Sequence, residues 1–190
     1  MLSSNTKARM LVLDTEVYSN TGGQMSKSSQ LGQVAEFANF GKRNYKKDLF
    51  RIAMSYPNCY VASISLGANP IQAIKAFKEA ENHDGPSIII AYSPCIEHGI
   101  KSGCSNKEEK LVVETGYTLL MRYNPDEKKL YLDSKEPKYD KLDELWSNET
   151  RFNALKIKDE KLAKELLESQ KDEIIKRYNY YKEITSKQDA

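Results

Sequence analysis

The order of the apolar segments is the feature that most constrains the fold of this chain. Three short apolar runs occur in the first half of the sequence, at 10–13, 59–64 and 87–92. Each has the length and composition of a strand, and segments with helical spacing separate them. The order strand, helices, strand, helix, strand predicts a parallel sheet with right-handed crossovers and helices on its faces. Because the run 10–13 is continuously apolar, we expect that strand to be buried on both faces.

The helices are predicted from apolar spacing and from capping residues. Spacing within 33–40 predicts a helix that Gly41 ends. Asp48 is expected to cap a helix that runs through Met54, and Asn69 is expected to cap one that has Pro70 at its first position.

The second half of the chain changes in composition. A helix is expected at 107–114 and strands at 117–123 and 129–132, and the segment beyond about Lys135 becomes highly charged. Within it, apolar residues at near-helical spacing predict one amphipathic helix over 159–181. The chain as a whole therefore reads as an α/β protein with a helical C-terminal extension.

Composition excludes several classes of protein. The net charge is +2, from 29 basic and 27 acidic residues, which gives no electrostatic footprint for nucleic acid. The longest apolar run, 88–92, is too short to span a membrane, and the first residues lack the apolar region of a secretory signal. Three irregularly spaced cysteines form no disulfide framework, so a reducing, cytoplasmic compartment is expected.

The loop 14–24 is the stretch with the most chemical content. It follows a predicted strand directly, at the position where open α/β sheets bind ligands. It carries short oxygen-bearing side chains and two adjacent glycines, Gly22 and Gly23. Oxygen ligands suit Mg²⁺, and glycines let the backbone approach a bulky anion, so the loop favours a metal–diphosphate site. The alternative is a polar loop with a Gly–Gly turn and no ligand.

The same loop carries a resemblance to a known family. The stretch LVLDTEVYSNTGGQ at 11–24 resembles the pyruvate:ferredoxin (flavodoxin) oxidoreductases. The likeness continues through GKR at 41–43, GPSIIIAYSPCI at 85–96 and LDSK at 132–135, and it covers residues 10–155 collinearly.

The resemblance implies a fold, an activity and a set of partners. Members of the family are homodimeric enzymes with thiamine diphosphate, Mg²⁺ and [4Fe–4S] clusters, found in the cytoplasm or in an anaerobic energy organelle. They convert pyruvate and coenzyme A into acetyl-CoA and CO₂, and they pass electrons to ferredoxin or flavodoxin. The likeness places residues 1–134 in the C-terminal portion of the thiamine-diphosphate domain and 135–190 in a C-terminal extension.

The likeness also assigns residues to the cofactor. Thr15 and the backbone carbonyl of Val17 match two Mg²⁺ ligands. Asn20 matches the asparagine that lies beside the cofactor near the substrate, and with Thr21, Gly22 and Gly23 it forms the expected cofactor-binding segment.

Another Mg²⁺ ligand of the family lies in a Gly-Asp-Gly motif upstream of that segment. None of the nineteen residues before Asn20 forms this motif, so we expect the chain to work only with the remainder of the oxidoreductase and to be inactive alone. The alternative is a stand-alone, non-catalytic binding or assembly module, or a degenerate remnant of the same domain.

The cysteines and histidines are interpreted partly from the likeness and partly from their neighbours in the sequence. Cys95 matches the last ligand of the [4Fe–4S] cluster nearest the thiamine, and the alternative is a buried free thiol. Cys59 is expected to pack in the core, and Cys104 has no expected role. His83 is expected at the surface, and His98 is not supported as a metal ligand.

Two further surface features are interpreted from composition. The basic cluster 42–47 is expected to be a solvated face rather than a site for an anionic partner such as coenzyme A or ferredoxin. The tyrosines within 178–181 are expected to pack against another subunit or domain.

Overall fold

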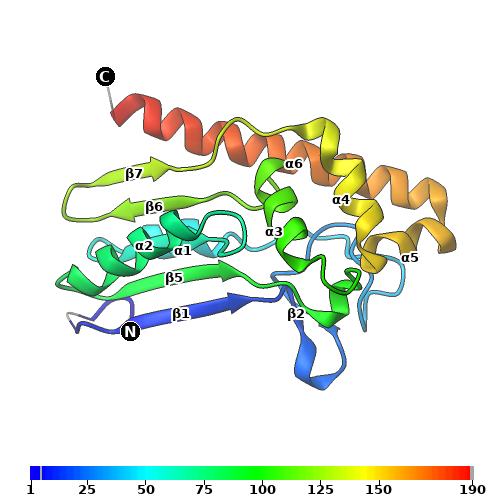
Figure 1. The fold of residues 1–190 in the computed structure, drawn as a ribbon, viewed down its shortest axis with the longest axis horizontal. Coiled ribbons are helices and arrows are strands. Elements are labelled where there is room, and N and C mark those ends of the chain that lie inside the picture. Colours follow the sequence, from blue (N-terminus) through cyan, green and yellow to red (C-terminus); the bar gives the residue numbers. More distant parts are fainter. Residues whose placement is uncertain (5, 189–190) are drawn as a thin grey trace.

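A computed structural model describes residues 1–4 and 6–188, and its centre is a five-stranded mixed sheet (Figure 1). The strand order is β1–β5–β4–β6–β7. The bounds are β1 Arg9–Asp14, β4 Tyr60–Ile64, β5 Ser87–Tyr92, β6 Met121–Asn124 and β7 Lys129–Leu132.

The predicted parallel arrangement of the first three strands is confirmed, and the two later strands extend the sheet as an antiparallel pair. β1, β5 and β4 are parallel, with Asp14 paired to Tyr92 at their carboxyl ends. β6 runs antiparallel to β4, with Ser63 opposite Met121, and β7 is antiparallel to β6. The chain leaves β5 at the carboxyl end of the parallel strands and enters β6 at that same end. Because no crossover carries the chain back to the amino end of those strands, β6 runs in the opposite direction.

The expectation that the first strand is buried on both faces is wrong. β1 lies at the edge of the sheet, and only Met10 and Val12 pack against the core. Leu11 and Leu13 lie on the other face and are 53% and 63% exposed. An apolar run does not distinguish an edge strand from a central one, because that depends on which other segments cover it.

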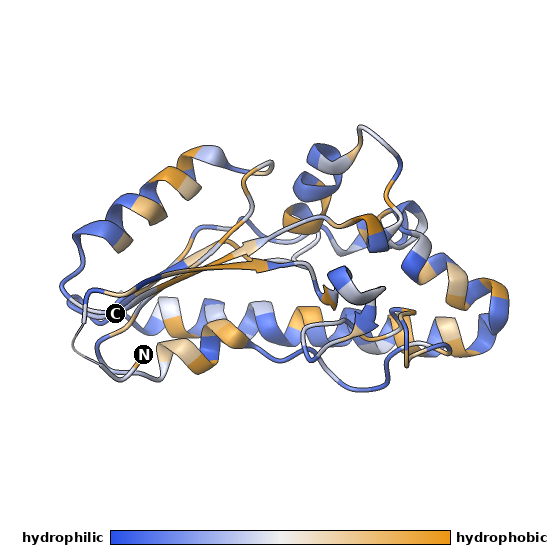
Figure 2. Ribbon diagram, turned by 90° about the horizontal axis from the view of Figure 1, so that it is seen from below, coloured by the Kyte–Doolittle hydropathy of each residue, from blue (hydrophilic) through white to orange (hydrophobic). Residues whose placement is uncertain are grey.

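Helices cover both faces of the sheet, as Figure 2 shows with the sheet seen nearly edge-on. α2 (Pro70–Asn82) packs on one face, and α1 (Leu49–Met54) and α6 (Glu160–Gln188) pack on the other. The predicted caps are confirmed: Asp48 Oδ1 accepts from the Arg51 amide at 2.9 Å, and Asn69 Oδ1 accepts from the Gln72 amide at 3.0 Å.

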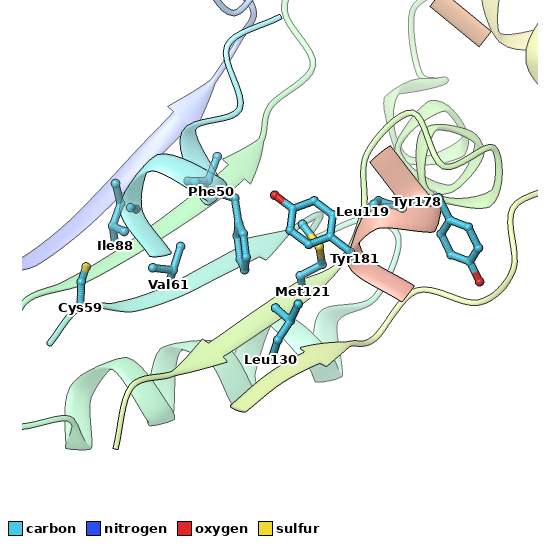
Figure 3. Packing of buried hydrophobic residues seen from close by; sticks show 11 residues of the cluster. Phe50, Cys59, Val61, Ile88, Leu119, Met121, Leu130, Tyr178 and Tyr181 are labelled. Carbon is cyan, nitrogen blue, oxygen red and sulfur yellow. The ribbon is translucent and has the colours of Figure 1, made fainter. Parts of the chain in front are cut away.

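The core between the sheet, α1 and α6 is aromatic and aliphatic (Figure 3). Phe50 of α1 meets Tyr181 of α6 edge-to-face, with 5.7 Å between ring centroids. The Tyr181 hydroxyl donates to Asp48 Oδ2 at 2.7 Å. Tyr178 and Tyr181 therefore pack against this chain's own sheet and helix α1, and the amphipathic helix predicted from their spacing is confirmed.

The helix predicted over 33–40 does not form. The backbone bonds other segments instead: the Val34 amide donates to Arg151 O at 2.9 Å, and the Glu36 amide donates to Gly23 O at 3.1 Å. Phe37 has φ 66° and is exposed. Gly41 ends no helix; at φ +75° it lies against Gly32, where a Cβ would come within 3.1 Å of the Gly32 carbonyl. Tertiary hydrogen bonds have overridden the helical spacing here.

The remaining elements gather at the carboxyl end of the sheet. The helices there are α3 Ser105–Glu114, α4 Leu142–Asn148, α5 Thr150–Lys158 and the single turns η1 Ser19–Thr21, η2 Ile96–His98 and η3 Tyr139–Lys141. The loop after β1 folds into a hairpin of β2 (Val17–Tyr18) and β3 (Gln24–Met25). Within residues 1–4 and 6–188, no helix has the length and apolar character needed to cross a bilayer.

Candidate metal and diphosphate site

A cleft of about 490 Å³ lies beside the carboxyl ends of β1 and β5, on the sheet face that α1 and α6 cover. The turn after β1, from Asp14 to Tyr18, contributes to its wall, as do Lys46 and Arg177. The predicted loop thus lies at the edge of the sheet where parallel α/β folds bind ligands.

The two residues that the family likeness assigns to Mg²⁺ are neighbours in this turn. Thr15 Oγ1 lies 3.0 Å from the carbonyl oxygen of Val17, to which it donates a hydrogen bond. Adjacent oxygens around an octahedral Mg²⁺ with bonds of 2.0–2.1 Å are separated by about 3 Å. The donor chemistry and spacing of this pair therefore fit two ligands of that cation.

Glu16, between those two residues, is a site residue that sequence reasoning missed. It is 1% exposed, and its backbone has φ 61°, in the left-handed region that non-glycine residues seldom adopt. Its carboxylate accepts from Lys46 Nζ at 2.7 Å, from Arg151 Nη1 at 2.6 Å and from the Tyr117 hydroxyl at 2.7 Å. A buried carboxylate with this many donors holds its own position and that of the turn.

Electrostatics fix the charge of Glu16. Burial alone would raise its pKa, but the Lys46 ammonium and the Arg151 guanidinium outweigh burial, and the pKa of Glu16 lies far below its ordinary value. Lys46 also donates to Asp14 Oδ2 at 2.7 Å. Burial opposes its charge, but Glu16 and Asp14 raise the pKa of Lys46 above its ordinary value. The turn therefore contains a buried, fully ionised group.

Arg151 links this network to α5. Besides Glu16, it donates to Glu149 and, through Nη2, to the Tyr117 hydroxyl at 3.0 Å. Its side chain and that of Glu149 are both fully buried. Burial opposes its charge, while Glu149, Tyr117 and Glu16 hold the pKa of Arg151 well above its usual range.

His98 fixes the other side of the turn. Its Nε2 lies 2.9 Å from the Thr15 carbonyl, and its ring is fully buried. Burial, with repulsion from Arg151, lowers the pKa of His98 to about 4, so it is a neutral donor at physiological pH.

The other histidine is not where the sequence placed it. His83 was expected at the surface, but it is 5% exposed and contacts Asp126 and the Asn58 carbonyl. The turn that contains His83 is covered by the segments around Asn58 and Asp126, which are distant from it in sequence.

The predicted cofactor-binding segment forms the hairpin tip beyond the cleft. Asn20, Thr21 and Gly22 are exposed and Gly23 is buried, and none of them lines the cleft. Gly22 and Gly23 have φ of 104° and 77°, and a Cβ on Gly23 would lie 2.6 Å from a carboxylate oxygen of Glu97. Both glycines are therefore required by the backbone, whatever they bind. Their role towards a diphosphate stays a prediction.

Cys95 lies at the start of η2, on the segment that holds His98 and Glu97. It is a half-buried free thiol. Among the residues that the structure describes, no group of three or more His, Cys, Asp or Glu could hold a metal ion. A [4Fe–4S] cluster, which takes four ligands, does not fit this chain alone, and the role of Cys95 stays a prediction.

The structure also tests the predictions for the other two cysteines and for the basic cluster 42–47. Cys59 is buried in the core, as predicted, and Cys104 is half-buried at the start of α3. The interpretation of 42–47 as a solvated face is wrong for two lysines: Lys42 is 4% exposed, and Lys46 binds Asp14 and Glu16. The spacing of Asp14 and Glu16 could have signalled a cationic partner, but the partner's position 30 residues away could not be read from the sequence.

Comparison with known proteins gives the same family as the resemblance. No protein-family model matches the chain. The pyruvate-flavodoxin oxidoreductase of Trichormus variabilis is 45% identical over 193 residues, which is 99% of this chain and 16% of that protein. The pyruvate:ferredoxin oxidoreductase of Moorella thermoacetica is 46% identical over 189 residues, which is 97% of this chain and 16% of that protein.

Two other proteins are similar in part. The mitochondrial pyruvate dehydrogenase [NADP(+)] of Euglena gracilis is 44% identical over 97% of this chain and 10% of its own length. A solved 2-oxoglutarate:ferredoxin oxidoreductase from Magnetococcus marinus has a TM-score of 0.47 and 24% identity, over 50% of this chain and 33% of that chain. At 45% and 46% identity over nearly its whole length, this chain is a homologue of one segment of the pyruvate-flavodoxin and pyruvate:ferredoxin oxidoreductases, and it spans 16% of their length.

Proposed function

We propose that this chain supplies one part of the thiamine diphosphate–Mg²⁺ site of a pyruvate:ferredoxin or pyruvate:flavodoxin oxidoreductase. The complete enzyme would convert pyruvate and coenzyme A into acetyl-CoA and CO₂ and pass the electrons to ferredoxin or flavodoxin. The observation that carries the proposal is the 3.0 Å approach of Thr15 Oγ1 to the Val17 carbonyl, in a turn at the carboxyl end of β1.

The proposed roles follow from the chemistry of each group. Thr15 and Val17 would each give one oxygen to Mg²⁺, which prefers such hard ligands and keeps phosphate oxygens as others. The hairpin tip at Thr21, Gly22 and Gly23 would lie against the diphosphate, because glycine lets the backbone approach a bulky anion. The Gly22 and Gly23 amides donate to the Ser19 and Tyr18 carbonyls at 3.2 and 3.1 Å, and so they fix the shape of the tip. The Asn20 side chain would offer a donor and an acceptor beside the reacting carbon.

The thiamine cofactor supplies the carbanion chemistry that breaks the bond next to a ketone. The part of this chain is to hold the diphosphate end and to fix its orientation. The buried Glu16 carboxylate, which is not a proposed ligand, would keep Thr15 and Val17 on the same side of the turn.

Cys95 is proposed as one cluster ligand in the complete enzyme. It lies directly after β5, three residues before His98, whose ring contacts the Thr15 carbonyl. The segment that carries the proposed cluster ligand therefore touches the segment that carries the proposed metal ligand. The other cluster cysteines would come from the remainder of the oxidoreductase.

A chimeric enzyme tests the proposal. In it, this chain replaces the matching segment of the Moorella thermoacetica oxidoreductase, to which it is 46% identical. We expect pyruvate- and coenzyme A-dependent reduction of ferredoxin. Thr15→Val, which keeps the shape and removes the oxygen, should raise the Mg²⁺ concentration for half-maximal activity by at least about tenfold. An active chimera in which Thr15→Val leaves the Mg²⁺ requirement unchanged would remove Thr15 from the site.

Two further measurements address the other parts of the proposal. Cys95→Ser in the same chimera should lower the cluster content measured by EPR, and an unchanged signal would overturn that assignment. Calorimetry of the 190-residue chain with thiamine diphosphate and Mg²⁺ should show weak binding or none. Micromolar binding would contradict the need for a second polypeptide segment, and an inactive chimera would favour a non-catalytic binding module.

A further inference from the structure

We infer that Arg151 is a positioning residue for the turn that carries Thr15 and Val17, and that it acts through the buried carboxylate of Glu16. The inference rests on the proposed function for what the turn binds. The link between α5 and the turn is visible in the structure without it.

The first observation is that the turn contains an unfavourable backbone conformation at Glu16. Glu16 has φ 61°, a region that disfavours residues with a Cβ, and such a backbone persists only where its surroundings impose it. No glycine relieves it, since the sequence here is Asp14-Thr15-Glu16-Val17. Within the turn, the Glu16 amide donates to Asp14 Oδ1 at 3.2 Å and Thr15 Oγ1 donates to the Val17 carbonyl, and groups outside the turn supply the rest of the constraint.

The second observation is where that constraint comes from. Arg151 Nη1 donates to Glu16 Oε2 at 2.6 Å, across 135 residues of sequence, and both side chains are fully buried. The same guanidinium donates to Glu149 and to the Tyr117 hydroxyl. It also donates to Gln33 Oε1 at 3.2 Å. A planar guanidinium with four partners has one orientation, so it defines where the Glu16 carboxylate can lie.

The third observation is that Arg151 itself is anchored. Its backbone carbonyl accepts from the Val34 amide at 2.9 Å, and its neighbour Phe152 is fully buried in the cluster around Trp146. The position of α5 is thus passed to the Glu16 carboxylate through the Arg151 side chain. Lys46 and His98 hold the same turn from other directions, at Glu16 Oε1 and at the Thr15 carbonyl.

Hydrogen exchange of the full chain tests the inference, with a second buried arginine as the control. Arg122 also bridges two carboxylates, Glu79 and Asp133, and is 4% exposed, but its bridges join α2, β6 and the residue after β7. Arg151→Met and Arg122→Met therefore remove similar groups at two places. Arg151→Lys restores the charge, and Tyr117→Phe is a milder change if Arg151→Met does not fold.

We expect a crossed result, in which each arginine variant accelerates exchange mainly in its own region. In Arg151→Met and Tyr117→Phe, amides of the hairpin 15–25 should exchange faster, by about tenfold or more for Arg151→Met, relative to amides of β6 and β7. In Arg122→Met, amides of β6 and β7 should instead exchange faster relative to those of the hairpin. Arg151→Lys should recover part of the protection of the hairpin amides. Equal acceleration of both regions in Arg151→Met and in Tyr117→Phe would overturn the inference, as would unchanged exchange of the hairpin.

The chimeric enzyme separates this inference from the proposed function. If both hold, Arg151→Met should raise the Mg²⁺ concentration for half-maximal activity with turnover at saturating Mg²⁺ largely retained, and Arg122→Met should not. If hydrogen exchange gives the crossed result but the chimera is inactive, the proposed function fails and the mechanical link stands. If the chimera is active and Arg151→Met leaves the Mg²⁺ requirement unchanged, the positioning role fails and the proposed function stands.

Discussion

Two buried arginines organise opposite parts of this molecule, and they do so differently. Arg122 on β6 donates to both Glu79 oxygens and both Asp133 oxygens, and the side chains of these carboxylates are 30% and 19% exposed. Arg151 on α5 binds Glu16 and Glu149, whose side chains are completely buried. One network is partly hydrated and the other is dry.

The surroundings sharpen this difference. Near Arg151, His98 Nδ1 and Gln33 Nε2 are buried without a hydrogen-bond partner, and Glu16 has left-handed backbone geometry. The surroundings of Arg122 have fewer such features: the buried Oε1 of Gln72, whose Nε2 donates to Asp133, and the left-handed backbone of Lys128 in the turn between β6 and β7, with φ 51°. Buried charges, unpartnered polar atoms and unfavourable φ each cost stability, and they concentrate where a protein holds a functional group in place. The contrast teaches that the two ion networks have different purposes: one ties elements together, and the other constrains a turn.

The largest predicted effect is on stability. Arg151→Met should lower the free energy of unfolding by about 4 kcal/mol, because it leaves the Glu149 carboxylate buried without its cation. Arg122→Met should cost about 2 kcal/mol, since water can reach Glu79 and Asp133. Denaturant unfolding of the two variants measures the difference. Equal losses would mean that the two networks do not differ in solvation, and the comparison would fail.

Pattern and capping rules predict much of the region near Arg122 and little of the region near Arg151. The residues that cap α1 and α2 and the stripe of α6 can be read from the sequence, because they depend on neighbours within about one or two turns. The Glu16–Arg151 pair depends on a contact across 135 residues, and although Asp14 and Glu16 together suggest a cationic partner, nothing in the local sequence identifies Arg151 as one.

The candidate site shows the same division. The Thr15–Val17 pair is two residues apart, so the sequence motif could place it, and the structure brings the two oxygens to 3.0 Å. The segment 33–40, which was predicted to be a helix, depends instead on distant residues, since its amides donate to the carbonyls of Arg151 and Gly23. Local periodicity cannot compete with such hydrogen bonds when the segment's own apolar face finds no continuous partner.

The second prediction concerns pH and belongs to the dry network. Burial, and then the nearby Glu149 carboxylate, raise the pKa of Glu108 to about 7, although Asn148 donates to it at 3.0 Å. Its folded pKa exceeds its unfolded pKa, so its stabilising contribution is fully present below about pH 4.5 and is lost as the pH rises through 7.

Glu108→Gln isolates this contribution, because a neutral amide keeps the shape and has no pH dependence. From pH 4.5 to pH 7.5, wild type should lose about 2 kcal/mol of unfolding free energy relative to the variant. Chemical denaturation across that range measures it. Parallel stability curves would show that Glu108 is hydrated, and the dry character of this end of the molecule would then be limited to Arg151 and its direct partners.

The smallest predicted effect compares one hydroxyl in each network. The Tyr117 hydroxyl donates to Glu16 at 2.7 Å and accepts from Arg151 at 3.0 Å, whereas the Tyr131 hydroxyl, beside Arg122, donates to Glu127 in an exposed position. Tyr117→Phe should cost about 1.5 kcal/mol, because two buried charged groups each lose a partner that water cannot replace. Tyr131→Phe should change stability by less than about 0.5 kcal/mol, because water replaces the lost bond and the ring still lies under Arg122. Paired thermal unfolding measures both, and a loss at Tyr131 as large as that at Tyr117 would show that exposure does not separate the networks. Because the two substitutions remove the same atom, a larger loss of stability at Tyr117 than at Tyr131 would instead be attributed to the dehydration of the Glu16–Arg151 pair.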